Sequence, residues 1–186
     1  MTDLCRHPGR RSPRRLRHIL RFWRATRAST AIEFAIVAPL FIGLLISILE
    51  IGIYFFAQNV LQTAAVQAGR LFLTGQAQAS NLTQAQLVSS VCPNIQALFT
   101  CGSLMVDVNT FSSFGGANTS TPTLTYNAQG QVTNSWNYTP GTAGQIMVVR
   151  LMYLWPVVSG PLAIFNPNVT NGTSLIMGVT AFKVEP

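Results

Sequence analysis

The stretch from Arg27 to Phe56, RASTAIEFAIVAPLFIGLLISILEIGIYFF, decides the fold of this chain of 186 residues. It begins at the last arginine of a basic leader and continues as an apolar run that only Glu33 and Glu50 interrupt. The sixteen residues from Phe34 to Leu49 carry no charge. About 20 helical residues, at about 1.5 Å each, cross the ~30 Å hydrocarbon layer of a membrane. The run therefore predicts one transmembrane helix over about residues 34–57.

The basic residues of the chain gather upstream of this run. Only 9% of the chain is charged, yet nine arginines lie in the first 27 residues. A basic tail can neutralise the phosphates of nucleic acid, but arginines next to an apolar span usually hold that side of it in the cytoplasm. We therefore expect residues 1–28 to form a basic cytoplasmic leader, and we expect no nucleic-acid partner. A cleavable secretory signal is the alternative, although its apolar core normally spans only ~7–15 residues.

Two residues distinguish the predicted helix from a simple anchor. A carboxylate such as Glu33 is costly inside a bilayer unless it has a partner. It could pair with a leader arginine at the cytosolic interface. If a peptidase cut between Ala28 and Ser29, it could instead pair with the new N-terminal ammonium of a neighbouring subunit and set the axial register. Pro39 lacks a backbone N–H and predicts a helix kink, which membrane helices tolerate.

The strings STAIEFAIVAPLF, ILEIG and LQTAAVQAGR together resemble the TadE-like proteins of the tight-adherence pilus system. The resemblance implies a pseudopilin that a prepilin peptidase processes, with Ala28 as the last leader residue and Ser29 as the first mature residue. It also implies that Glu33 and Phe34 are the glutamate–aromatic pair used in assembly. Ala28 stands where the family usually has glycine. The closing sequence VTAFKVEP also fits the family's pattern.

The helix is predicted to continue beyond the membrane, so that residues 29–75 form one element. Apolar residues recur there at steps of three and four, which is typical of a helix face that packs on a domain. Gly75 is the expected C-terminal cap. The members of the stripe are Val60, Leu61, Ala64, Ala65, Ala68, Leu71 and Phe72.

Residues 76–186 predict a small α+β domain. Thr83 and Gln86 fit a capping box that opens one short helix, expected to break at Pro93. Strands are expected at 104–111, 123–127, 131–138, 145–155 and 174–185, where β-branched and apolar residues lie between turn residues. In these strands Arg150 is expected to be an edge-directed or paired charge rather than a ligand, and Gly178 is a possible β-bulge. Element order therefore predicts a long N-terminal transmembrane helix against a four- to five-strand antiparallel sheet. The family resemblance implies the same pilin-like architecture.

Cys92 and Cys101 are the only cysteines after the leader. In an oxidising periplasm they could close a disulfide loop, worth roughly 2–3 kcal/mol by the chain-entropy model. Two free buried thiols are the alternative. We expect no metal site, because no histidine follows His18.

The residue inventory does not favour an enzyme. Beyond the membrane run, the only carboxylate side chains are Asp107 and Glu185, and general acid–base catalysis needs a tuned pair within hydrogen-bond reach. We expect no catalytic residues, no cofactor and no small-molecule substrate.

The leading hypothesis is a pseudopilin-like assembly component of a bacterial tight-adherence (Flp-type, type IV-related) pilus or secretion system. It would sit in the inner membrane with its C-terminal domain in the periplasm, or in an extracellular pilus after processing. The expected partners are the prepilin peptidase and other pilus or pseudopilin subunits. The alternative is an uncleaved single-pass envelope protein that acts as a scaffold or binding module.

Overall fold

The computed structural model of the chain describes residues 26–157, 169–170 and 172–185. The chain divides into two compact units, Met1–Ile46 and Ser47–Pro186, which we call the first and second units. The predicted basic leader lies almost entirely outside the described residues, and so does most of the connection between the last two predicted strands.

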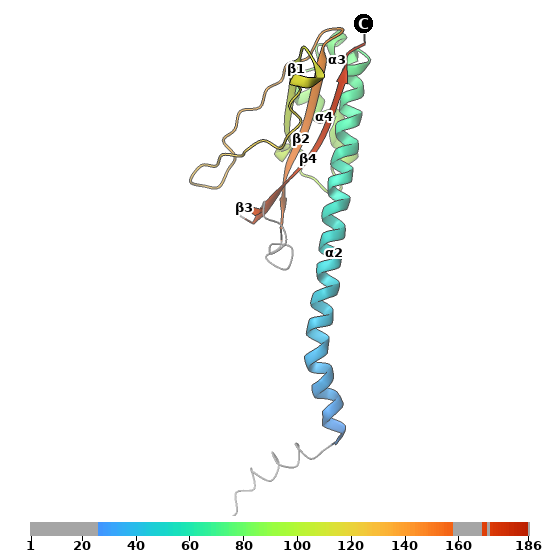
Figure 1. Cartoon of the computed structure of the whole chain (residues 1–186), viewed down its shortest axis with the longest axis vertical. Coiled ribbons are helices and arrows are strands. Elements are labelled where there is room, and N and C mark those ends of the chain that lie inside the picture. Colours follow the sequence, from blue (N-terminus) through green and yellow to red (C-terminus); the bar gives the residue numbers. More distant parts are fainter. Residues whose placement is uncertain (1–25, 158–168, 171, 186) are drawn as a thin grey trace, which may run out of the picture. The chain divides into compact units, whose positions relative to one another are not determined.

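One helix, α2, runs from Thr26 to Leu73 (Figure 1). It forms because apolar and small residues follow one another with Pro39 as the single proline and no other strong helix breaker. It ends where Gly75 takes a left-handed conformation with φ of 72°, which glycine adopts at little cost, so the predicted cap is confirmed.

The N-terminal part of α2 is long and apolar enough to cross a membrane. From Thr30 onward it contains an 18-residue window with a mean hydropathy of 2.5, none of which is buried within the chain. Large apolar side chains such as Phe34 and Leu40 are 73% and 80% exposed. The prediction of a long apolar N-terminal helix is thus confirmed.

The second unit contains an antiparallel sheet with strand order β1-β2-β4-β3. Its three long strands are β1 (Met105–Phe111), β2 (Ile146–Pro156) and β4 (Thr173–Lys183), and β3 (Val169–Thr170) has two residues only. The central strand β2 pairs along its whole length with β4, with Arg150 opposite Val179. On its other side Arg150 lies opposite Asp107 of β1.

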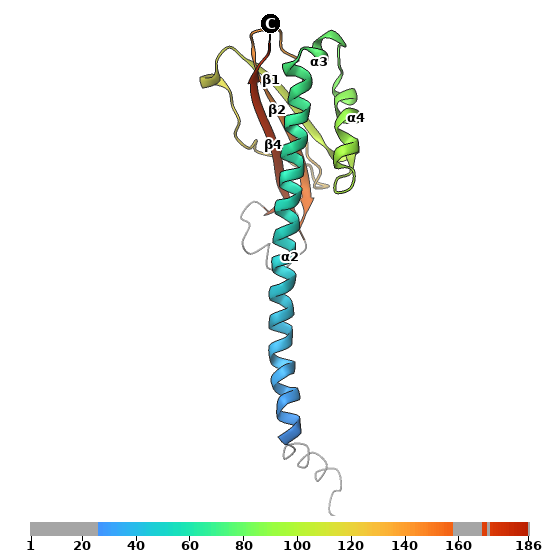
Figure 2. The same cartoon turned by 90° about the vertical axis from the view of Figure 1, so that its right-hand side faces the viewer.

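Helices cover one face of this sheet. Figures 1 and 2 show the second-unit part of α2 lying along the strands, with α4 beside it. Short elements complete the unit: α3 (Gln76–Ala79), α4 (Gln84–Ile95) and the single 3₁₀ turns η1 (Cys101–Ser103) and η2 (Phe114–Gly116). The predicted capping box is confirmed, because Thr83 Oγ1 accepts from Gln86 N and Gln86 Oε1 accepts from Thr83 N.

The core lies between the helices and the sheet. The predicted stripe of α2 is confirmed: Leu61, Ala65 and Phe72 are fully buried, and Leu87 of α4 and Val149 of β2 belong to the same cluster. The small residues let the α2 backbone come close to β4. Burying such apolar surface contributes about 25 cal/mol per Å² and dominates the stability of the unit.

Two glutamine side chains of α2 form hydrogen bonds with backbone groups at the edge of β4. Gln62 donates to Val179 O at 2.8 Å and accepts from Val179 N at 3.0 Å, as a paired strand would. Gln58 donates to Met177 O at 2.7 Å. An unpaired strand edge invites association with other strands, so these amides protect the edge while they fix the height of α2 on the sheet.

The other face of the sheet carries a buried ion pair. Arg150 donates Nε and Nη2 to Asp107 Oδ2, and the two side chains are 13% and 4% exposed. This confirms that Arg150 is a paired charge. The pair also holds the long segment between β1 and β2, because Asp107 Oδ1 accepts from Asn137 N at 3.0 Å. Arg150 Nη1 donates to Ser120 O at 3.2 Å.

The segment continues past Asn137 along the edge of β1. Thr139 N donates to Val108 O at 3.0 Å, and the Tyr138 hydroxyl donates to Leu82 O at 2.7 Å. Burial raises the pKa of that hydroxyl and keeps it neutral.

The antiparallel sheet is confirmed. The finer expectation of four to five strands is not, because only β1, β2 and β4 are long and β3 has two residues. The expected strands at 123–127 and 131–138 form an isolated bridge between Tyr126 and Val132 instead of a ladder. The turn between them is present, with Gly130 at a φ of 74°. Asparagine and threonine side chains compete with the ladder: Asn134 Oδ1 accepts from Thr125 N at 2.7 Å.

The predicted break at Pro93 is wrong, because α4 continues through it to Ile95. A proline near the end of a helix removes only one intrahelical hydrogen bond. The disulfide at Cys92 ties the same turn to η1. Gly178 was a candidate β-bulge, but the β2–β4 register is continuous through it.

Candidate functional site

The expected processing site lies at the start of α2. The backbone of Ala28 and Ser29 is helical, because both residues lie in the first described turn of α2.

Glu33 and Phe34 follow Ser29 within two helical turns. Both side chains are exposed, and they stand beside a run of exposed apolar residues that includes Ile36 and Val37. A carboxylate at the beginning of such a run needs an oppositely charged or hydrogen-bonding partner wherever the run is in lipid. This geometry suits an interaction between helices rather than a catalytic pocket.

Pro39 lies inside α2, and the helix continues through it. The proline cannot donate to the carbonyl of Ala35, four residues earlier. A kink at this position therefore stays a prediction, while a break in the helix does not occur.

Glu50 is a functional candidate that the sequence reasoning missed. Its side chain is half-buried, and Oε1 is buried with no hydrogen-bond partner in the part of the chain that the structure describes. Tyr54, one helical turn further on, bonds through its hydroxyl to Ser174 Oγ of β4 at 3.2 Å. The signal was visible in the sequence as the second charge of the apolar run, but burial of one oxygen could not be read from it.

An open groove of about 330 Å³ lies on the side of α2 next to α4. Asn94 of α4 donates to Gln67 Oε1 across its rim at 2.8 Å. The groove holds amides, a hydroxyl and apolar carbons but no ionisable group, so it offers no acid–base chemistry. Its lining is Phe56, Asn59, Val60, Thr63, Ala64, Gln67 and Asn94.

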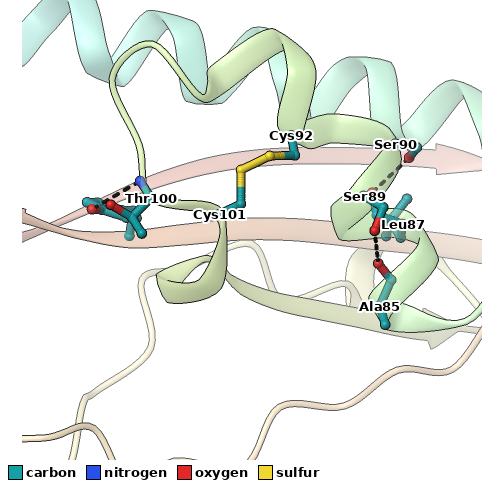
Figure 3. Close-up of a disulfide and its surroundings, with 8 residues drawn as sticks. Ala85, Leu87, Ser89, Ser90, Cys92, Thr100 and Cys101 are labelled. Atoms are coloured by element: carbon teal, nitrogen blue, oxygen red, sulfur yellow. Dashed lines mark hydrogen bonds between the residues drawn. A yellow bond between two sulfur atoms is a disulfide. The ribbon is translucent and has the colours of Figure 1, made fainter.

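The structure joins Cys92 to Cys101 in a disulfide with Cα atoms 5.8 Å apart (Figure 3). It links the last turns of α4 to η1, ahead of β1. Tyr153 and Trp155 of β2 pack edge-on against Phe99, inside the closed loop, with ring centroids 5.0 and 5.7 Å apart. The disulfide therefore closes a loop that packs on β2, as a structural disulfide does. Among the described residues, no group of three or more His, Cys, Asp or Glu side chains could hold a metal ion.

Residues 28–70 match the family model of the TadE-like proteins. This is a TadE-like segment. The match confirms the predicted resemblance and associates the chain with the tight-adherence pilus. It covers Ala28, Ser29, Glu33, Phe34 and Pro39, and it ends at Arg70, before the sheet begins. No curated protein and no solved structure matches the chain. The TadE-like segment, residues 28–70, is therefore the part of the molecule that indicates its function.

Proposed function

We propose that this chain is a non-enzymatic, pseudopilin-like assembly component of a bacterial tight-adherence pilus or secretion system. The observation that carries the proposal is the TadE-like segment, in which an exposed Glu33 stands five residues after Ala28 at the head of an exposed apolar helix. Such a helix works by lying in lipid and then packing against other helices, with the carboxylate fixing the register.

The same proposal includes the topology. The arginine leader stays in the cytoplasm, α2 crosses the inner membrane, and the sheet is in the periplasm. The Cys92–Cys101 disulfide supports this orientation, because disulfides persist in oxidising compartments. The prepilin peptidase, acting on the cytoplasmic side of α2, and other pilus subunits are the proposed partners.

Processing between Ala28 and Ser29 is tested by N-terminal sequencing. In cells with the prepilin peptidase we expect the chain to begin at Ser29, because the resemblance to the TadE-like proteins, whose family model matches from residue 28, implies a cut between Ala28 and Ser29. In cells without the peptidase we expect the leader with its nine arginines to remain. An intact leader in both strains would contradict processing.

An uncleaved single-pass scaffold is the second candidate, and one observation favours it. The backbone at Ala28 and Ser29 is helical, and a helical peptide must unwind before a protease can bind it. Under this alternative Glu33 has no special role, and removing the carboxylate leaves assembly unchanged.

The variant Glu33→Ala separates the two candidates. If Glu33 sets the register, we expect pili counted by electron microscopy to be lost, while membrane fractionation shows normal insertion. Ile32→Ala is the matched control, because Ile32 is 57% exposed next to Glu33 and carries no charge. Normal piliation in the Glu33→Ala strain would remove the register role.

A further inference from the structure

The exposed apolar run of α2 continues into the second unit. Large apolar side chains are exposed along the helix as far as Phe56, which is 60% exposed. Beyond it the exposed side chains are mainly polar, beginning with Asn59 and Thr63, and Val66 is an exception. Apolar side chains are more stable in lipid than in water, so the change between Phe56 and Asn59 is the expected lipid–water boundary. The exposed apolar side chains of this part are Ile48, Leu49, Ile53, Phe55 and Phe56.

Hydrogen bonds within the second unit fix the height of the sheet on this part of α2. The Tyr54 hydroxyl bonds to Ser174 Oγ, near the beginning of β4, at 3.2 Å. Two turns further along the helix, Gln62 bonds to the backbone of Val179. The helix and the strand therefore run in the same direction, and β4 begins at the level of Tyr54. Phe56 lies about 3 Å beyond that level, so lipid that covers Phe56 also reaches the beginning of β4.

The end of the sheet at this level, which we call the base, is uncharged. It consists of Leu154–Pro156 of β2 and Thr173–Leu175 of β4, which pair with one another. In Figure 1 it is the end of the sheet that lies farthest from α3. Strand β2 has no Asp, Glu, Lys, Arg or His after Arg150, and β4 has none before Lys183. Contact with lipid is costly for charged groups, and the base has none to desolvate.

Aromatic side chains gather at the same level. Trp155 lies opposite Ser174 in the β2–β4 register, and Ser174 is the residue that Tyr54 contacts. Phe55 stands edge-on to Tyr54, with ring centroids 6.0 Å apart. Tyrosine and tryptophan are enriched where a membrane meets water, because their rings are apolar and also carry a polar group. The level of Ser174 therefore has the composition of an interfacial aromatic belt.

We propose that the base of the sheet rests on the lipid bilayer, in its interfacial layer, with the lipid–water boundary between Phe56 and Asn59. This inference rests on the proposed topology, in which α2 crosses the membrane, and it specifies which part of the second unit contacts lipid. Arg70 and Lys183, both exposed, lie toward the opposite end of the helix–sheet contact, where they meet water. The membrane is thus a second support for the sheet, in addition to α2.

Fluorescence quenching by lipid tests the contact at the base. The full chain with Cys5→Ser and Pro156→Cys is labelled with a thiol-reactive fluorophore and placed in phospholipid vesicles, while the Cys92–Cys101 disulfide stays closed. Pro156 is exposed, so the label leaves the core intact. We expect lipids with brominated acyl chains to lower its fluorescence roughly twofold or more, because the acyl region lies within reach of the base. Aqueous iodide should quench it weakly.

The matched control is Ala181→Cys, which is exposed on the same face of the sheet. Pro156 pairs with Thr173, and Ala181 follows Thr173 by 181 − 173 = 8 residues, an even number and about 26 Å of strand. We expect iodide, and not brominated lipid, to quench this label. If the label at Pro156 behaves like the one at Ala181, the base stands in water and the proposal is overturned. Protection of the Pro156 label from both quenchers overturns it as well, because protein then covers the base.

A second pair of labels tests the boundary on α2. Phe56→Cys and Thr63→Cys are seven residues apart, so they lie on one face of the helix. We expect brominated lipid to quench the label at residue 56 and iodide to quench the label at residue 63. Quenching of the residue 56 label by iodide alone would place the membrane surface below the base and overturn the proposal. Quenching of the residue 63 label by lipid would overturn the stated boundary.

Failure of this contact can be told apart from failure of the proposed function. Ile48→Cys carries the label on α2 at a position that is 58% exposed and below the base. Lipid quenching at Ile48 but not at Pro156 would reject the contact and retain the transmembrane helix. An absence of lipid quenching at both would reject the topology and the contact together. Lipid quenching at both, with normal piliation in a deletion strain, would retain the contact and reject the pilus role.

Discussion

Gly178→Ala is expected to lower the free energy of unfolding of the second unit by about 3 kcal/mol or more, at the upper end of what overpacking costs. A Cβ at this position would lie 2.4 Å from Leu61 O and 2.9 Å from Gln62 Cα. These are backbone atoms of α2, so no rotamer change can make room. A shift of the helix would also strain the bonds between Gln62 and Val179.

The matched control is Gly102→Ala, because a Cβ at Gly102 would meet no atom within 4 Å. We expect this change to alter stability by less than about 0.5 kcal/mol, as surface substitutions usually do. Urea unfolding of the full chain in detergent, followed by near-ultraviolet circular dichroism, measures both. Equal stability of the two variants would contradict the close approach of α2 to β4.

The elements that could be predicted are those whose signals are local. The apolar run, the stripe from Val60 to Phe72 and the Thr83–Gln86 capping box each depend on residues within a few turns. The strands β1, β2 and β4 follow from continuous β-branched and apolar sequences. Neighbouring residues therefore sufficed for the long helix and the antiparallel sheet.

What could not be predicted depends on contacts between distant residues. Gly178 has the sequence signal of a bulge, but it is a glycine because the Leu61 backbone passes over it. The 123–138 hairpin has a good turn, yet Asn134 and its neighbours satisfy the backbone through side chains. A close backbone contact decides the first outcome, and side-chain hydrogen bonds decide the second.

The candidate site also contains residues that could be predicted from the sequence and features that could not. Glu33 and its neighbours could be chosen because a charge in an apolar run is visible in the sequence alone. Glu50 has the same signal, but its buried oxygen and its place one turn from Tyr54 depend on how α2 lies on β4. The groove needs α4 beside α2, which no local pattern specifies.

Asp107→Ala is expected to cost about 3–5 kcal/mol, the usual effect of breaking a buried ion pair. Arg150 would keep its charge at 13% exposure without a counter-ion. Asn137 N would lose its acceptor, because it donates to Asp107 Oδ1. The segment between β1 and β2 should therefore loosen around Asn137, and limited proteolysis should cut residues 117–144 faster than in the unaltered chain.

The double variant Asp107→Leu with Arg150→Met separates the pair from the fold. Replacing both charges by apolar side chains of similar size is often neutral or stabilising, so this chain should unfold in urea closer to the unaltered one than Asp107→Ala does. Proteolysis of residues 117–144 should still be faster, since both Ser120 O and Asn137 N lose their side-chain partners. If Asp107→Ala and the double variant were equally unstable, the cost would come from cavities or loop anchoring rather than from an unpaired Arg150. If Asp107→Ala cost less than about 1 kcal/mol, the pair would behave as an exposed one. The burial of Asp107 beneath the segment argues against that result.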